Sequence, residues 1–61
     1  MKHQSKVELT VEFGPDETID TEVLDKVREA AVLLSDAFGL GDVQRFENAH
    51  GKGTIYTFVA E

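Results

Sequence analysis

Cysteine is absent from this 61-residue chain, so disulfides, thiolate metal sites and cysteine nucleophiles are excluded. A chain of this length forms a single domain, residues 1–61, and buries only about 60% of the surface that its unfolded form exposes. Small domains that lack disulfides depend on a very well-packed core, a metal or a partner chain. The sequence therefore favours a tightly packed monomer or an oligomer.

Long apolar runs are absent as well. The longest, residues 30–34, is far too short to span a membrane. The polar residues 1–6 do not have the pattern of a signal peptide, and residues 1–5 are expected to form a frayed tail. We therefore predict a cytoplasmic location, in the protein's own cell or in an infected host, with no membrane partner.

Basic residues are scarce, and the net charge is −6. Because nucleic-acid binding relies on Lys and Arg to neutralise phosphates, direct binding to DNA or RNA is disfavoured. Residues 8–25 contain seven acids and no base: Glu8, Glu12, Asp16, Glu17, Asp20, Glu22 and Asp25. This acidic block predicts a surface that docks on a basic site of a larger protein. The alternative is that these acids stabilise the start of a helix and keep the surface soluble.

Three segments have the patterns of strands. Residues 6–13 alternate polar and apolar side chains, which is typical of a half-buried strand. Residues 43–50 and 54–60 predict a β-hairpin. The last of these segments is apolar on both faces, which is typical of a central strand or of a strand that meets another chain.

The hairpin loop is expected to comprise the three residues Gly51-Lys52-Gly53. This loop makes Phe46 face Phe58 and stacks aromatic side chains on one face of the sheet. A two-residue loop would pair Phe46 with Thr57 instead. We favour the three-residue loop.

Residues 21–38 predict a helix, with Asp20 as its N-cap and Gly39 as the left-handed residue after its end. Its apolar stripe is expected to face the sheet. The stripe consists of Val23, Val27, Ala30, Leu34 and Ala37, widened by Leu24, Ala31 and Phe38. Val32 and Leu33 interrupt the polar face of this helix.

Together these elements predict an α+β fold: β-α-β-β, with a three-stranded sheet and one helix packed on one face. If the first two strands run parallel, the last strand can lie between them. The face of the sheet away from the helix is then a mixed acidic and apolar surface of Glu8, Thr10, Glu12, Ile55, Thr57 and Val59. The exposed apolar residues predict an interface with a partner or with another copy: Val32, Leu33, Ile55 and Val59.

Catalysis has little support in the sequence. His50 lies beside the hairpin glycines, and no Ser or Thr is placed by a motif to be activated by it. Residues 51–54 contain a Gly-Lys-Gly-Thr run, but a phosphate-binding loop needs a following helix. The acids at 16, 17 and 20 lack the calcium-loop pattern. We predict no enzyme activity, no cofactor and no metal site.

The features that remain predict a protein-binding module, an inhibitor or modulator that docks its acidic face on a basic site of a larger protein, such as a site that binds nucleic acid. In size and charge, with no motif involved, the chain resembles the small inhibitors that phages encode against host enzymes and defence systems, including anti-CRISPR proteins. The alternative is a self-assembling domain, such as a homodimer, with a structural or small-ligand-binding role.

Overall fold

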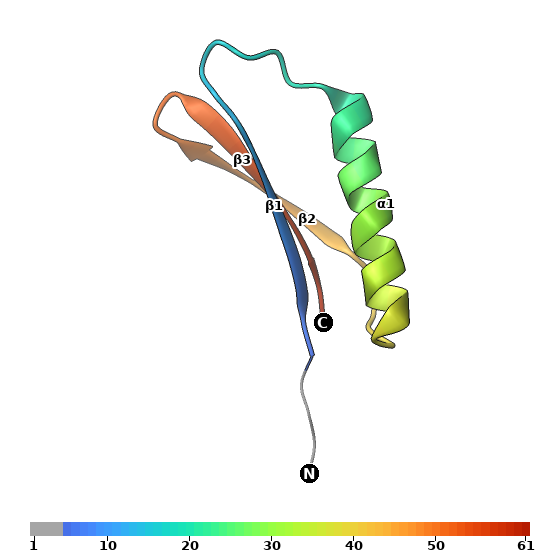
Figure 1. Cartoon of the computed structure of the whole chain (residues 1–61). Coiled ribbons are helices and arrows are strands. Elements are labelled where there is room, and N and C mark those ends of the chain that lie inside the picture. The colour runs from blue at the N-terminus through green and yellow to red at the C-terminus, as the bar shows by residue number, and fades with distance from the viewer. Residues whose placement is uncertain (1–4) are drawn as a thin grey trace.

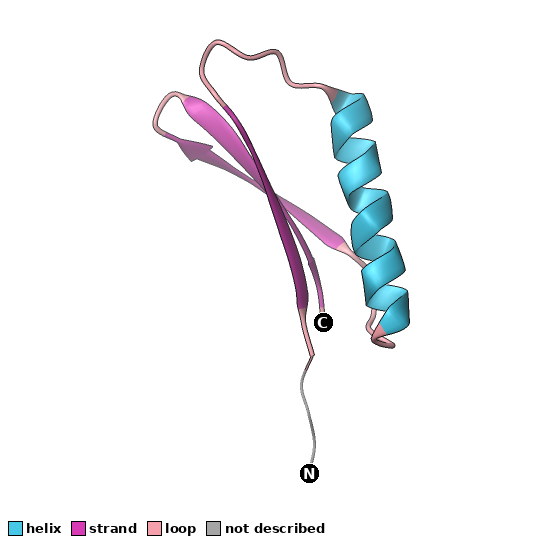
Figure 2. Ribbon diagram, in the orientation of Figure 1, coloured by secondary structure: helices cyan, strands magenta, loops and turns pink. Residues whose placement is uncertain are grey.

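The computed structural model describes residues 5–61 and confirms the predicted β-α-β-β order. Residues 1–4, which make up most of the expected frayed tail, lie outside the described residues. The elements are β1 (Val7–Phe13), α1 (Thr21–Ala37), β2 (Gln44–His50) and β3 (Gly53–Ala60). One helix lies along one side of a twisted sheet (Figures 1 and 2).

β3 is the central strand of the sheet, as its two apolar faces predict. The strand order is β1-β3-β2, and β3 runs antiparallel to both neighbours. β1 and β2 are therefore parallel to each other, and α1 connects them across the sheet. Val7 lies opposite Ala60, so the first ladder joins the two ends of the described chain.

Both ends of α1 are capped as the sequence predicts. The Asp20 carboxylate accepts a hydrogen bond from the Glu22 backbone N–H at 2.9 Å. After the helix, Gly39 adopts a φ of 68°, and the Leu40 N–H donates to the Ser35 carbonyl at 2.8 Å. This bond and the Gly39 N–H to Asp36 carbonyl bond form a Schellman motif, in which glycine avoids the strain of a left-handed side chain.

The core lies between α1 and the β1–β3 half of the sheet. Phe58, which is 1% exposed, is the largest fully buried side chain, and the rings of Phe13 and Tyr56 meet edge to face with centroids 6.0 Å apart. Within the described chain, α1 packs on β1 and β3 and does not reach β2. All seven residues of β2 are consequently exposed.

The preferred hairpin register is wrong, and the two-residue alternative is observed. His50 pairs with Gly53, so the loop is Gly51-Lys52 and Phe46 lies opposite Thr57. Gly51 has a φ of 62° at the first central position of the turn, where a type II′ turn requires a positive value. A shift of one residue turns every β2 side chain to the opposite face. Phe46 is therefore on the face away from α1, whereas Phe58 is beneath it.

Gly53 is glycine for a different reason from Gly51. It is the first residue of β3, and a Cβ added there would collide with the backbone carbonyl oxygen of Phe13 in β1. The close approach of two backbones excludes any side chain at this position. The two glycines thus serve a turn and a strand contact, not one three-residue loop.

Only some of the helix residues that were predicted to face the sheet are buried against it. The buried helix residues are Leu24, Ala31 and Ser35, with Val27 half-buried beside them. The remaining members of the predicted stripe are exposed, including Phe38 just after the helix. Four of them, Val23, Ala30, Leu34 and Ala37, are called here the exposed apolar line. α1 is therefore rotated about its axis relative to the prediction, and its contact with β1 and β3 leaves part of its apolar surface exposed.

Candidate functional site

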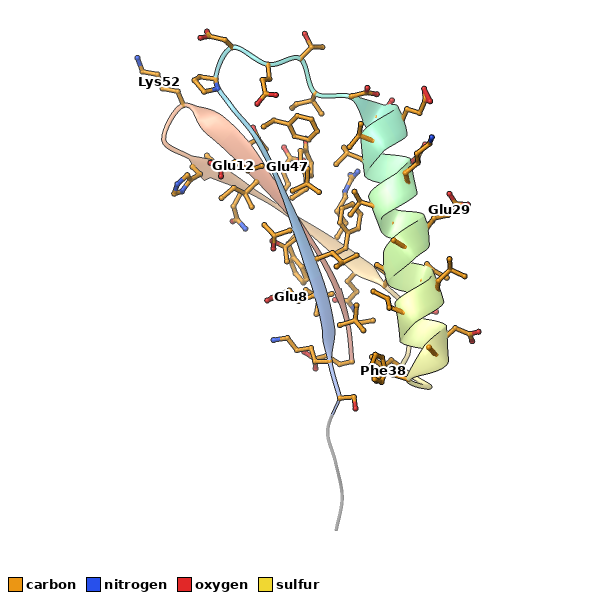
Figure 3. The ribbon with its side chains drawn as sticks, in the orientation of Figure 1. Glu8, Glu12, Glu29, Phe38, Glu47 and Lys52 are labelled. Carbon is orange, nitrogen blue, oxygen red and sulfur yellow. The ribbon has the colours of Figure 1, made fainter. Side chains whose placement is uncertain are left out.

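The face of the sheet away from α1 combines charged and apolar side chains on an accessible surface. The ladders set Glu8 opposite Val59, Thr10 opposite Thr57 and Glu12 opposite Ile55, so these six residues share one face, as predicted. Figure 3 shows Glu8 and Glu12 on the side of β1 away from the helix. We call this surface the open sheet face: Glu8, Thr10, Glu12, Gln44, Phe46, Asn48, His50, Ile55, Thr57 and Val59.

An apolar centre lies in the open sheet face. Phe46 of β2 is 48% exposed, and Ile55 and Val59 of β3 are half-buried. Ladder pairing places Thr57 opposite Phe46, between Ile55 and Val59 along β3. A partner that covered this centre would remove aromatic and branched aliphatic surface from water, which is the composition of an interface core.

Carboxylates surround one end of this centre. A shallow hollow there is lined by Phe46, Val59, Gln44, Asp42 and Glu61. Glu8 lies in the same row across the sheet, opposite Val59, which is itself opposite Gln44. The hollow therefore offers aromatic and aliphatic surface for the stem of a Lys or Arg side chain and carboxylates for its charged head.

The seven acids of the predicted block lie in three places. Two are on the open sheet face, and three are in the loop between β1 and α1. The other two are in the first half of α1. In that order they are Glu8 and Glu12; Asp16, Glu17 and Asp20; and Glu22 and Asp25.

Two of the loop acids have local structural roles. The Glu17 carboxylate accepts a hydrogen bond from the Gly14 N–H at 2.6 Å, which closes the turn after β1. Asp20 caps the helix through the Glu22 N–H. For these two positions the structural explanation of the acidic residue is sufficient.

Replacing Asp20 separates its capping role from its charge. Asp20→Ala is expected to lower the free energy of unfolding by about 1 kcal/mol, because the Glu22 N–H loses its acceptor. Asp20→Asn keeps an acceptor and should unfold near the wild-type urea midpoint. Equal destabilisation by both substitutions would show that the negative charge, not the cap, is what stabilises the helix.

The predicted apolar interface residues lie on two separate surfaces. Ile55 and Val59 belong to the open sheet face. Leu33 is 71% exposed on α1, and Val32 lines a second hollow between α1 and the segment that leads into β2. These four residues therefore cannot form one continuous contact.

Among residues 5–61, no group of three or more His, Asp or Glu side chains is placed to hold a metal ion. The His50 Nε2 lies 4.0 Å from a Glu12 carboxylate oxygen, and both side chains are more than half exposed. In residues 5–61, no helix has the length and apolar character needed to cross a membrane.

Sequence reasoning missed three residues of the site. Phe46 was assigned to the wrong face through the hairpin register, and the turn chemistry of Gly51 was the signal that could have corrected it. Asp42 and Glu61 lie outside the acidic block, and they meet because the Gly41 N–H donates to the Glu61 carbonyl at 3.0 Å. That contact between distant segments leaves no local pattern.

No protein-family model, curated protein or solved structure matches this chain.

Proposed function

We propose that the chain is a protein-binding module that docks its open sheet face on a basic site of a larger protein and thereby blocks or modulates that site. The observation that carries the proposal is the exposed apolar centre of Phe46, Ile55 and Val59 with carboxylates beside it. Apolar anchors surrounded by charged residues are the arrangement that supplies both affinity and orientation in protein interfaces.

Charge complementarity selects the kind of partner. The chain carries −6, and Glu8, Asp42 and Glu61 stand near the hollow on the open sheet face. A basic side chain entering the hollow would gain charge-assisted hydrogen bonds and contact with the Phe46 ring. Basic grooves that bind nucleic acid present such side chains, so a site of that class is the proposed target.

The experiment is affinity capture with the tagged chain, followed by titration calorimetry with the purified partner. We expect one stoichiometric partner that is released at high salt, because screening weakens the charge contribution. Glu8→Lys with Asp42→Lys should weaken binding about 100-fold, since each reversal replaces an attraction with a repulsion. Phe46→Ser should weaken it about tenfold or more through loss of the apolar anchor.

The matched control reverses two carboxylates elsewhere. Glu22→Lys with Glu29→Lys makes the same change in net charge on the outer side of α1, where Glu29 points away from the sheet (Figure 3). Binding should fall much less in this variant. Loss of binding in the helix variant, with retention in the Glu8 and Asp42 variant, would place the docking surface on the helix and contradict the proposal.

A further inference from the structure

We propose that two copies of this chain pair through the outer edges of β1 and the exposed apolar lines of α1 to form a dimer with a continuous six-stranded sheet. This interface lies at the opposite edge of the sheet from the Phe46 hollow, so the inference does not rest on the proposed docking function. The partner that pairs with the β1 edge is a second copy of the chain. The charges on β1 and the spacing of apolar residues on α1 indicate this.

The sheet has two free edges, and only one of them has apolar surface beside it. Within residues 5–61, the outer edges of β1 and β2 have no strand partner. β2 is exposed throughout and lies beyond the reach of α1. β1 carries the helix above it, so a strand added there would be accompanied by a helix contact, which an isolated edge pairing lacks.

The exposed apolar line lies on the β1 side of the helix. Around α1, the sheet-facing residues Leu24 and Ala31 are flanked by Val32 on one side and Leu34 on the other. Val32 lines a hollow with Val43, which leads into β2. Leu34 and the other members of the line therefore project past the free edge of β1, where a second copy would approach.

The spacing of this line is that of helix–helix contacts. Val23, Ala30, Leu34 and Ala37 recur at intervals of seven, four and three residues, the repeat that places one seam of a helix against another helix, and the half-buried Val27 occupies the position between the first two. Val23 and Leu34 are 40% and 42% exposed, although their spacing marks them as contact positions. The alanines allow close approach of two helices.

The dimensions of the fold agree with this pairing. α1 contacts β1 and β3 to similar extents, so its axis lies above the gap between these strands. Neighbouring strands are about 4.8 Å apart, so each helix axis lies about half that distance to the inner side of its own β1. With the two β1 strands paired across a twofold axis, the two helix axes are therefore about 10 Å apart. Packed helices have axes about 8–10 Å apart. The two helices would therefore touch without movement of either sheet.

Charge selects the register of the two β1 strands. A twofold axis perpendicular to the sheet sets each residue opposite one on the same face. Pairing centred on Thr10 would set Glu8 opposite Glu12 of the other copy, twice, which is repulsive. Pairing centred on Leu9 sets Lys6 opposite Glu12, twice, which is attractive. Of these two registers, charge favours the antiparallel pairing about Leu9.

The test is sedimentation equilibrium of the purified chain over a wide concentration range. The wild type should have the mass of two chains. Lys6→Glu and Glu12→Lys should each weaken dimerisation about tenfold, because each sets like charges opposite one another twice. The double variant Lys6→Glu with Glu12→Lys restores opposite charges and should return the dissociation constant to within about threefold of wild type. Leu34→Glu should weaken the dimer at least about 100-fold.

The matched control is Glu47→Lys on β2, the opposite edge of the sheet. It makes the same charge change as Glu12→Lys and should leave the dimer intact. Circular dichroism of each variant confirms that it is folded, and the charge-swap pair keeps the test decisive if Leu34→Glu does not fold. A wild type that is monomeric at every concentration, or a double variant as weak as the single ones, would overturn the proposal.

Discussion

Gly53→Ala is expected to lower the free energy of unfolding by about 3 kcal/mol, a large part of the stability of a domain this small. The added Cβ would collide with the Phe13 carbonyl oxygen. Backbone atoms cannot rotate away as a side chain does, so β1 would have to separate from β3. Alanine also restricts the unfolded chain, which favours folding by less than about 1 kcal/mol and does not offset the collision. Urea unfolding followed by circular dichroism measures the difference.

Two neighbouring substitutions serve as controls for Gly53→Ala. Gly51→Ala meets no atom within 4 Å but has a φ of 62°, so about 1 kcal/mol of strain is expected. Lys52→Ala lies in the same exposed turn and should change stability by less than about 0.5 kcal/mol. A Gly53→Ala variant as stable as wild type would mean that residue 53 lies in a three-residue loop and that the observed register is incorrect.

Phe58→Ala is expected to cost about 3–5 kcal/mol and to leave most of the chain unfolded at 25 °C. Phe58 is 1% exposed in the central strand, opposite Leu9 and within the cluster that joins β1, β3 and α1. Truncation removes its ring from the middle of the core. The neighbouring side chains on two strands cannot move into the cavity without breaking the backbone hydrogen bonds between the strands. Thermal unfolding by calorimetry should show a lost or greatly reduced transition.

A volume-conserving substitution separates packing from other effects. Phe58→Leu keeps an apolar side chain at the same position and should cost less than Phe58→Ala, about 1–2 kcal/mol. A cooperative transition at lower temperature is expected for it. Equal loss of folding in both variants would show that the site requires the aromatic ring itself; wild-type stability in both would show that Phe58 is not central to the core.

Local patterns predicted the elements of this fold because each has a short-range cause. Strict alternation placed β1 within one residue, and the cap at Asp20 and the glycine at 39 defined the helix ends. The two apolar faces of β3 predicted its central place. These properties depend on neighbours in sequence, so one chain was enough to infer them.

Contacts between distant segments explain what the sequence did not reveal. The β2 register is set by the Gly51 turn and by the approach of Gly53 to Phe13, because β2 buries no face that could fix it. The rotation of α1 depends on its contacts with β1 and β3, which the pattern of the helix alone does not reveal. For the site, alternation correctly predicted that Glu8, Glu12, Ile55 and Val59 share one face of the sheet. The face of Phe46 depends on the hairpin register, so the wrong register predicted it on the opposite face.

The central position of β3 also determines the order in which the chain can assemble. The β2–β3 hairpin pairs segments that are adjacent in sequence and can form early. Pairing of β1 with β3 requires closure of a loop that contains α1 and β2. Closing so long a loop is slower than forming local contacts, so the pairing of β1 with β3 is expected to be the slower step. If β1 joins the sheet last, its outer edge becomes available to another copy only at the end of folding.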